Sequence, residues 1–242
     1  MYSMTMMKDV QVIGFDADDT LWVNEPYFYD TTRRFCKMMN RFATCEEVEQ
    51  MLYRTEVGNI QLYGYGAKSF ILSMVETALN ISNNQVDATT IGQVIDLGKE
   101  LISKPVELIA GVPEVLKALC RYNYRLIVAT KGDLLDQERK LKKSGLQDYF
   151  HHIEIMSDKQ EADYQKLLNN LDVDPKRFMM VGNSLKSDIL PVLNLGSYGI
   201  HIPFHTTWKH EEVDVSGLPQ DGFMQLNDIS EIPAILNGSD HR

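Results

Sequence analysis

Residues 10–21 read VQVIGFDADDTL, an apolar run that leads straight into Asp16 and Asp18. On an extended backbone, side chains two residues apart point the same way, so both carboxylates face one site at the end of a predicted strand. Two carboxylates that close repel each other unless a cation or a shared proton intervenes. The alternative is an Asx-rich turn that only satisfies loop amides. The stretch therefore predicts a metal or acid–base site, which the rest of the chain must support.

The composition is that of a globular protein with an excess of acidic residues. The chain has 242 residues, of which 24 are Lys or Arg and 34 are Asp or Glu, so its formal net charge is −10. This charge argues against nucleic acid and anionic membrane surfaces as partners, because both need clustered basic residues. It leaves room for a small phosphorylated substrate, since a bound cation and a few lysines can reverse the sign inside a pocket.

The cysteines and the apolar segments bear on the compartment. Cys36, Cys45 and Cys120 form no CxxC pair and no metal-ligand spacing, and their odd number suits free thiols in a reducing compartment. Residues 1–8 lack the apolar core and cleavage site of a signal peptide. No apolar run approaches the roughly 20 residues that span a bilayer. We therefore expect a cytoplasmic protein.

Apolar runs and helical patterns alternate over most of the chain, which is typical of βαβ units around a parallel sheet. The expected fold class is α/β, with a Rossmann-like parallel sheet core whose ligands bind at the carboxyl ends of the strands. After the first strand, the sequence predicts strands at 124–130, 152–156, 177–182 and 198–202, and helices at 113–121, 134–144, 161–171 and 185–195.

One interval breaks this alternation, because residues 21–109 carry no convincing strand. A βα connection normally takes a few residues, so we expect an inserted α-helical cap domain over residues 22–105 and a core made of residues 1–21 and 106–242. Such a cap would exclude water and select the substrate, whereas a helical bundle without a role is the alternative. Its helical patterns lie at 27–39, 46–53, 67–79 and 89–103.

Polar residues follow each of the next three predicted strands. Thr130 and Lys131 end one strand just before a helix start, where a hydroxyl and backbone amides can hold an anion. Lys159 follows the next strand. The motif GNSLKSD follows the fourth strand and contains Asn183 and Asp188, whose oxygens suit Mg²⁺. Taken singly, these residues would be read as a helix N-cap, a surface lysine and a first-turn acid.

The order of the motifs resembles the haloacid dehalogenase superfamily. Asp-x-Asp, Thr, Lys and Gly-Asn-Ser-x-x-x-Asp occur in that order between Val10 and about Ile202, and the helical insert lies where that family carries a helical cap. The resemblance implies that Asp16 is a nucleophile that forms an aspartyl-phosphate. It implies that Asp18 is the general acid, holding a proton while Asp16 is ionised.

The same resemblance implies a cofactor and a phosphate site. Mg²⁺ would be held by Asp16, Asp188 and the backbone carbonyl of Asp18, with Asn183 as a second-choice ligand. The phosphoryl oxygens would be bound by Thr130, Lys131 and Lys159.

Asp18 favours phosphoryl transfer over dehalogenation, because dehalogenases need no acid for the leaving halide and typically lack this second aspartate. We therefore expect a Mg²⁺-dependent phosphatase that acts on a small soluble phosphomonoester. A phosphosugar mutase that uses the same intermediate stays open. So does a non-catalytic, partner-binding protein on this scaffold, suggested by Asn183 where many phosphatase relatives carry Asp.

Possible substrate contacts are Trp22 and Asn24, after the catalytic strand, and Tyr65 and Lys68 in the insert. The segment YGYGAKS around Tyr65 superficially resembles a nucleotide-binding loop, but it lacks the glycine spacing and the preceding strand of a P-loop. Turn glycines at a helix start are the alternative reading. The sequence names neither the substrate nor the oligomeric state.

Overall fold

The chain divides into two compact units in the computed structural model, which describes residues 9–213 and 221–237. The sheet unit comprises Met1–Val23, Val106–Lys131 and Lys140–Arg242, and the helical unit comprises Asn24–Pro105 and Gly132–Arg139. The domain bounds 1–21 with 106–242, and 22–105, stay a prediction. Residues 1–8, where no signal peptide was expected, lie outside the described residues. Within the described part of the chain, no helix has the length and apolarity that crossing a bilayer requires.

A six-stranded sheet forms the centre of the sheet unit, with strand order β3-β2-β1-β4-β5-β6 and every pairing parallel. This confirms the predicted parallel sheet. The sixth strand was not predicted, because three residues are too few to show a periodic pattern. The strands are β1 (Val12–Phe15), β2 (Arg125–Lys131), β3 (His152–Met156), β4 (Phe178–Gly182), β5 (Tyr198–His201) and β6 (Phe223–Gln225).

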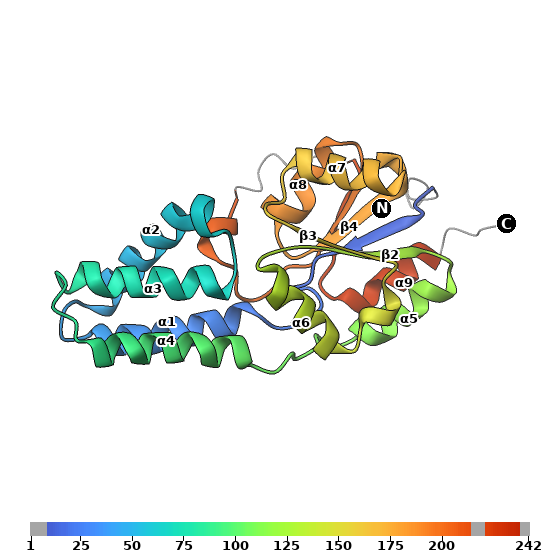
Figure 1. The fold of residues 1–242 in the computed structure, drawn as a ribbon. Coiled ribbons are helices and arrows are strands. Elements are labelled where there is room, and N and C mark those ends of the chain that lie inside the picture. Colours follow the sequence, from blue (N-terminus) through green and yellow to red (C-terminus); the bar gives the residue numbers. More distant parts are fainter. Residues whose placement is uncertain (1–8, 214–220, 238–242) are drawn as a thin grey trace. The chain divides into compact units, whose positions relative to one another are not determined.

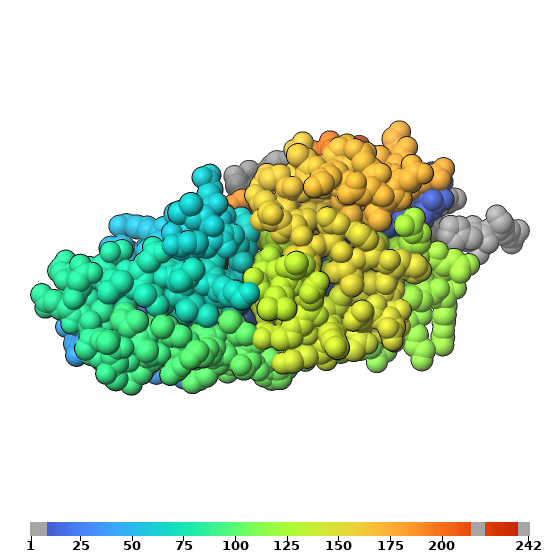
Figure 2. Space-filling model, viewed as in Figure 1, coloured from blue at the N-terminus to red at the C-terminus, as the bar shows by residue number. Residues whose placement is uncertain are grey.

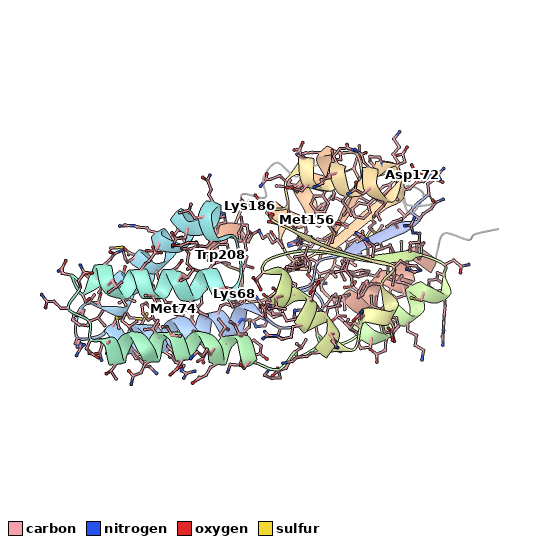
Figure 3. All side chains as sticks on the ribbon, viewed as in Figure 1. Lys68, Met74, Met156, Asp172, Lys186 and Trp208 are labelled. Carbon is pink, nitrogen blue, oxygen red and sulfur yellow. The ribbon has the colours of Figure 1, made fainter. Side chains whose placement is uncertain are left out.

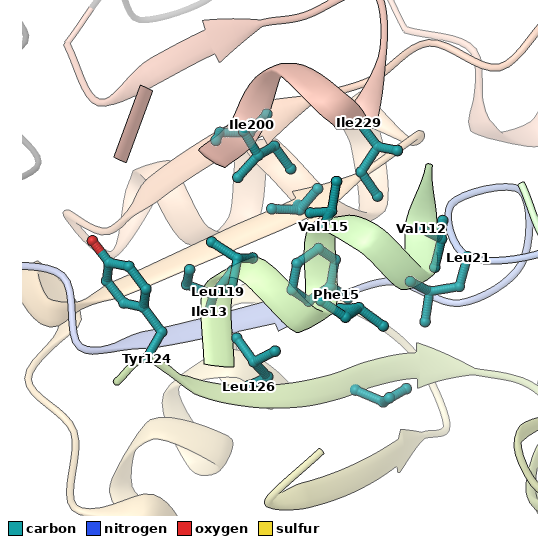
Figure 4. Close-up of a cluster of buried hydrophobic side chains, with 14 of the residues drawn as sticks. Ile13, Phe15, Leu21, Val112, Val115, Leu119, Tyr124, Leu126, Ile200 and Ile229 are labelled. Atoms are coloured by element: carbon teal, nitrogen blue, oxygen red, sulfur yellow. The ribbon is translucent and has the colours of Figure 1, made fainter. Parts of the chain in front are cut away.

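Helices cover both faces of this sheet, α7 (Glu161–Leu171) and α8 (Leu190–Asn194) on one and α5 (Val112–Arg121) and α9 (Ile232–Asn237) on the other (Figure 1). Alternation along β1 divides the core between the faces. Val12 joins the buried cluster that contains Tyr164 and Leu167 of α7. The next residue, Ile13, joins the cluster that contains Val115 and Leu119 of α5 (Figure 4).

The helix predicted over 185–195 is divided in two. Leu185–Ile189 forms a π-helical turn that ends where the N–H of Leu190 donates to the carbonyl of Leu185, and α8 follows. Pro191 lies in the first turn of α8, where its missing N–H costs no helix hydrogen bond. The predicted continuous helix is therefore wrong at this point. Single 3₁₀ turns lie at Gln147–Tyr149, Pro175–Arg177, Lys209–Glu211 and Ile229–Glu231.

The Asn24–Pro105 segment of the helical unit forms four helices around a hydrophobic core. Met74 (Figure 3) is fully buried there among side chains such as Phe35, Leu52 and Val94. The space-filling view shows that side chains fill the spaces between the helices drawn as ribbons in Figure 1 (Figure 2). The helices are α1 (Glu25–Met39), α2 (Cys45–Tyr63), α3 (Ala67–Ile81) and α4 (Ala88–Ser103). The helix predicted over 46–53 therefore extends a further ten residues, and α6 (Leu134–Ser144), predicted correctly, follows β2.

Two glycines of α4 give a matched test of this packing. A Cβ atom at Gly98 would overlap the side chain of Ile71 on α3, whereas a Cβ atom at Gly92 would meet nothing within 4 Å. We expect Gly98→Ala to lower the free energy of unfolding by about 1–3 kcal/mol through overpacking. Gly92→Ala should raise it by about 0.5–1 kcal/mol, because alanine loses less backbone entropy in a helix. Urea unfolding followed by circular dichroism measures both, and equal effects would contradict the close α3–α4 contact.

Candidate active site

The register of the sheet brings the predicted motifs to one edge. Phe15, the last residue of β1, lies opposite Val128 of β2 and Val181 of β4. Thr130 near the end of β2 lies opposite Ile155 of β3. The segments that follow β1, β3 and β4 therefore leave the sheet at the same edge. They carry Asp16, Lys159 and Asp188.

A buried lysine lies between two buried aspartates at this edge. Lys159 Nζ is 2.5 Å from Asp16 Oδ1 and 2.7 Å from Asp188 Oδ1. The three residues are 2%, 7% and 1% exposed, so water screens their charges little. They come from positions 143 and 29 residues apart in the sequence. One cation thus faces two carboxylates, which leaves an excess of negative charge.

Burial and the neighbouring charges together shift the pKa values of this triad. Burial raises the pKa of Asp16 to about 7; Lys159 acts to lower it, and the neighbouring Asp188 raises it further. Burial acts to lower the pKa of Lys159, but the two carboxylates outweigh burial and hold that pKa well above its ordinary value. Lys159 therefore stays charged, and the pair of aspartates is poised to accept a second cation.

The motif GNSLKSD fixes Asp188 by its own hydrogen bonds. The N–H of Ser184 donates to Asp188 Oδ2 at 3.0 Å, and the N–H of Ser187 donates to Ser184 Oγ at 3.0 Å. A Cβ atom at Gly182 would overlap the Asp188 carboxylate, so the glycine makes room for it. Asn183 is held on two sides: its Oδ1 accepts from Thr20 Oγ1 at 3.3 Å, and its carbonyl accepts from His201 Nε2 at 3.0 Å.

Trp22 and Lys140 hold Asp18 within a tight turn. Its Oδ1 accepts from Trp22 Nε1 at 2.7 Å and from Lys140 Nζ at 2.9 Å. Asp19, the next residue, has a φ of +62°, a left-handed conformation that non-glycine residues rarely adopt. Trp22, predicted as a substrate contact, is 1% exposed; it packs in the hydrophobic core, and its indole N–H donates to Asp18. That substrate contact stays a prediction.

Glu211 joins the site although no sequence pattern pointed to it. Lys131 Nζ donates to Glu211 Oε1 at 2.5 Å and to Ser187 Oγ at 2.8 Å. Glu211 Oε2 accepts from the hydroxyls of Ser184 and Ser187, each at 2.6 Å. Burial acts to raise the pKa of Glu211, but Lys131 and these hydrogen bonds outweigh burial and lower it to about 2. Glu211 therefore links the end of β2 to the loop that carries Asp188.

The segment before Glu211 is anchored by its neighbours. The rings of Trp208 and His210 lie 4.9 Å apart, and Lys186 Nζ donates to the carbonyl of His210 at 2.8 Å. Figure 3 labels Trp208 and Lys186. A glutamate 80 residues from Lys131 gives no sequence signal, so only the folded chain identifies this contact.

Three predicted substrate contacts belong to the helical unit. Asn24 lies at the N-cap position of α1, without a capping hydrogen bond from its side chain, and Tyr65 lies in the turn between α2 and α3. Lys68 Nζ lies 3.0 Å from both carboxylate oxygens of Asp133, two residues after Lys131. Thr130, predicted to bind phosphate, is buried at the end of β2. For all four residues, contact with a substrate stays a prediction.

A model of the haloacid dehalogenase-like hydrolase family matches residues 10–196. The chain belongs to this family. A solved haloacid dehalogenase-like family hydrolase from Xanthomonas campestris is 35% identical, with a TM-score of 0.84 over 96% of this chain and 92% of that chain. A 2-haloacid dehalogenase from Pseudomonas syringae, 17% identical with a TM-score of 0.64 over 96% of this chain and all of that chain, shares the fold.

Curated relatives of the family match a shorter segment. The N-acylneuraminate-9-phosphatase of Mus musculus is 29% identical over 127 residues, which are 50% of this chain and 48% of that protein. The glyceraldehyde 3-phosphate phosphatase of Pyrococcus abyssi is 32% identical over 94 residues, 36% of this chain and 39% of that protein. The chain thus spans half or less of the length of these two relatives.

Removing the buried cation should destabilise the sheet unit. Lys159→Met leaves Asp16 and Asp188 buried without a counter-charge, so we expect the free energy of unfolding to fall by about 3–5 kcal/mol at neutral pH without divalent cations. Lys166→Met, at an exposed position on α7, is the control and should change it by less than about 0.5 kcal/mol. A loss no larger than that of the control would rule out the buried ion triad.

Neighbouring glutamates test the link through Glu211. Glu211→Gln should lower the free energy of unfolding by roughly 1–3 kcal/mol, because Lys131 loses a largely buried counter-charge. Amide hydrogen exchange should accelerate over residues 184–188, whose serines the carboxylate holds. Glu212→Gln, at the exposed next position, should change neither quantity. Unchanged exchange in the Glu211 variant would contradict the proposed bracing of this loop.

Proposed function

We propose that this protein is a phosphatase that hydrolyses a small phosphomonoester through an aspartyl-phosphate on Asp16. The observation that carries the proposal is the second carboxylate, Asp18, two residues after the buried Asp16. Attack on phosphorus expels an alkoxide, which needs a proton, and a carboxyl group in this position can deliver one. The names of the two curated relatives, both phosphatases, support the same reaction class.

We propose Mg²⁺ as the cofactor, because the donor set fits it. Asp16 and Asp188 offer carboxylate oxygens around a single ammonium group, so this buried cluster has one carboxylate more than it has cations, and a divalent cation would offset that charge. The Asp18 carbonyl and Asn183 would add oxygens, although Thr20 already donates to Asn183 Oδ1. When bound, the ion supplies positive charge opposite the transferring phosphoryl group.

The first half-reaction transfers the phosphoryl group to the protein. A carboxylate oxygen of Asp16 attacks phosphorus, the bond to the leaving oxygen breaks, and Asp18 gives that oxygen a proton. Trp22 and Lys140 both donate to Asp18 Oδ1 and so hold the carboxyl group in place. An ammonium group has three N–H donors; Lys159 directs two to Asp16 and Asp188, and we assign the third to the phosphoryl oxygens.

The second half-reaction releases phosphate. Asp18, now ionised, takes a proton from water, and the water oxygen attacks the phosphorus of the aspartyl-phosphate. The bond to Asp16 breaks, which regenerates its carboxylate. Thr130 and Lys131, at the end of β2, would bind phosphoryl oxygens in both steps. The Lys131 side chain is engaged by Glu211 and Ser187, so its main-chain amide is the group we assign to this task.

We propose that the helical unit acts as a cap that selects the substrate, with Asn24, Tyr65 and Lys68 as its candidate contacts. A small phosphorylated metabolite is the substrate class, which the names of the relatives support and which the net charge of −10 leaves open. The compartment we propose is the cytoplasm. The odd number of cysteines and the lack of a CxxC pair support this assignment.

Two substrates with different leaving groups distinguish the nucleophile, Asp16, from the general acid, Asp18. With Mg²⁺, Asp16→Asn should abolish hydrolysis of both an aryl and an alkyl phosphate, by a factor on the order of 10⁴ or more. Asp18→Asn should slow the alkyl phosphate by about 10²–10⁴-fold and the aryl phosphate much less, because a phenolate leaves without a proton. Asp148→Asn, at an exposed position of the sheet unit, is the control and should retain full activity.

The outcome also separates the alternative functions. Substantial activity of the Asp16 variant would contradict the nucleophile assigned here. Transfer of the phosphoryl group back to a sugar phosphate, without release of inorganic phosphate, would identify a mutase. A wild-type protein that is inert toward a broad panel of phosphorylated metabolites with Mg²⁺ would favour a binding function.

A further inference from the structure

Two cysteines and a glutamate converge in the helical unit, outside the catalytic motifs. One sulfur or oxygen atom from each of Cys36, Cys45 and Glu49 lies within 4.8 Å of the others. Cys36 is buried, whereas Cys45 and Glu49 are exposed. The cluster therefore has an inner thiol against the protein core and an outer side that solvent can reach.

The helices fix the positions of these three side chains. Cys45 is the first residue of α2, and Glu49 follows at the i+4 position on the same helix face. Cys36 lies in the last turns of α1, and the short loop of residues 40–44 turns the chain back to α2. Thr44 caps α2 through a capping box with Glu47, which holds the start of the helix, and therefore Cys45, in place.

The spacing of the donor atoms suits a tetrahedral metal ion. Cys45 Sγ lies 3.6 Å from Glu49 Oε1, and Cys36 Sγ lies within 4.8 Å of the ligand atoms of both residues. In a tetrahedral zinc site with Zn–S and Zn–O bonds of about 2.3 and 2.1 Å, sulfur and oxygen ligands are about 3.6 Å apart. Three protein ligands leave a fourth position, which water can occupy on the exposed side.

We propose that Cys36, Cys45 and Glu49 form a binding site for a thiophilic divalent cation of the zinc type, which ties α1 to α2. On binding, each thiol loses its proton to solvent as a metal–sulfur bond forms, and no electron transfer is involved. Thiolate ligands select zinc-like ions over Mg²⁺, whereas the oxygen ligands around Asp16 and Asp188 have the opposite preference. This proposal does not depend on the proposed phosphatase activity.

Cobalt is the probe, because its spectrum reports sulfur ligation and tetrahedral geometry. The full chain is kept reduced with a phosphine and saturated with Mg²⁺, then titrated with Co²⁺. We expect a thiolate-to-cobalt charge-transfer band in the near ultraviolet and intense visible bands that saturate at one Co²⁺ per chain. Zn²⁺ should displace the cobalt and raise the thermal unfolding midpoint of the protein.

Variants of the three proposed ligands test whether the cobalt spectrum arises from this cluster. Cys36→Ser and Cys45→Ser should each lose most of the charge-transfer band, and Glu49→Gln should weaken Co²⁺ binding by on the order of tenfold or more. Cys120→Ser, which removes the thiol of the sheet unit, should leave the titration unchanged. Circular dichroism checks that each variant is folded, and the zinc-induced thermal shift should vanish in the Cys36 and Cys45 variants.

Three results would overturn the proposal. The first is a wild-type protein without the charge-transfer band. The second is a band that persists in both cysteine variants. The third is a thiol count that shows Cys36 and Cys45 joined in a disulfide under the reducing conditions of the titration.

Discussion

The placement of Lys159 between Asp16 and Asp188 is the interaction on which the rest of the site depends. Three charged groups are buried together, so each is stable only while the others are present. This requires that the ends of β1, β3 and β4 meet at one edge, which the parallel register provides. It also requires space beside β4, which Gly182 provides by having no side chain.

Charge pairing extends outward from this triad. Asp18 is paired with Lys140, and Lys131 is paired with Glu211, whose carboxylate also holds the hydroxyls of the loop that carries Asp188. Each lysine of the site therefore neutralises carboxylates that strand order brings together. These three lysines offset three of the four carboxylates, so the excess of negative charge at the site is small although the chain carries a net charge of −10.

The sequence predicted the features that local patterns determine. It missed features that depend on element length, on a proline, or on contacts between residues far apart in the chain. The five longer strands and the motif residues at their ends were predictable, because apolar runs and polar strand ends are local signals. The short β6, the full length of α2 and the π-helical turn at Leu185–Ile189 were not, since length and proline placement override periodicity. Glu211, Lys140 and the Cys36–Cys45 pair gave no signal, because their contacts are made only in three dimensions.

The hydrogen bond between the N–H of Val23 and the carbonyl of Glu107 closes the two ends of the helical insertion at 2.9 Å. Its consequence concerns the order in which the chain folds. Asp16 and Lys159 are 143 residues apart, a separation that makes closure slow and costly in entropy. An insertion that has already folded brings its ends together and removes roughly 80 residues from that loop. Early folding of the helices between β1 and β2 therefore lowers the entropic cost of bringing Asp16 and Lys159 together.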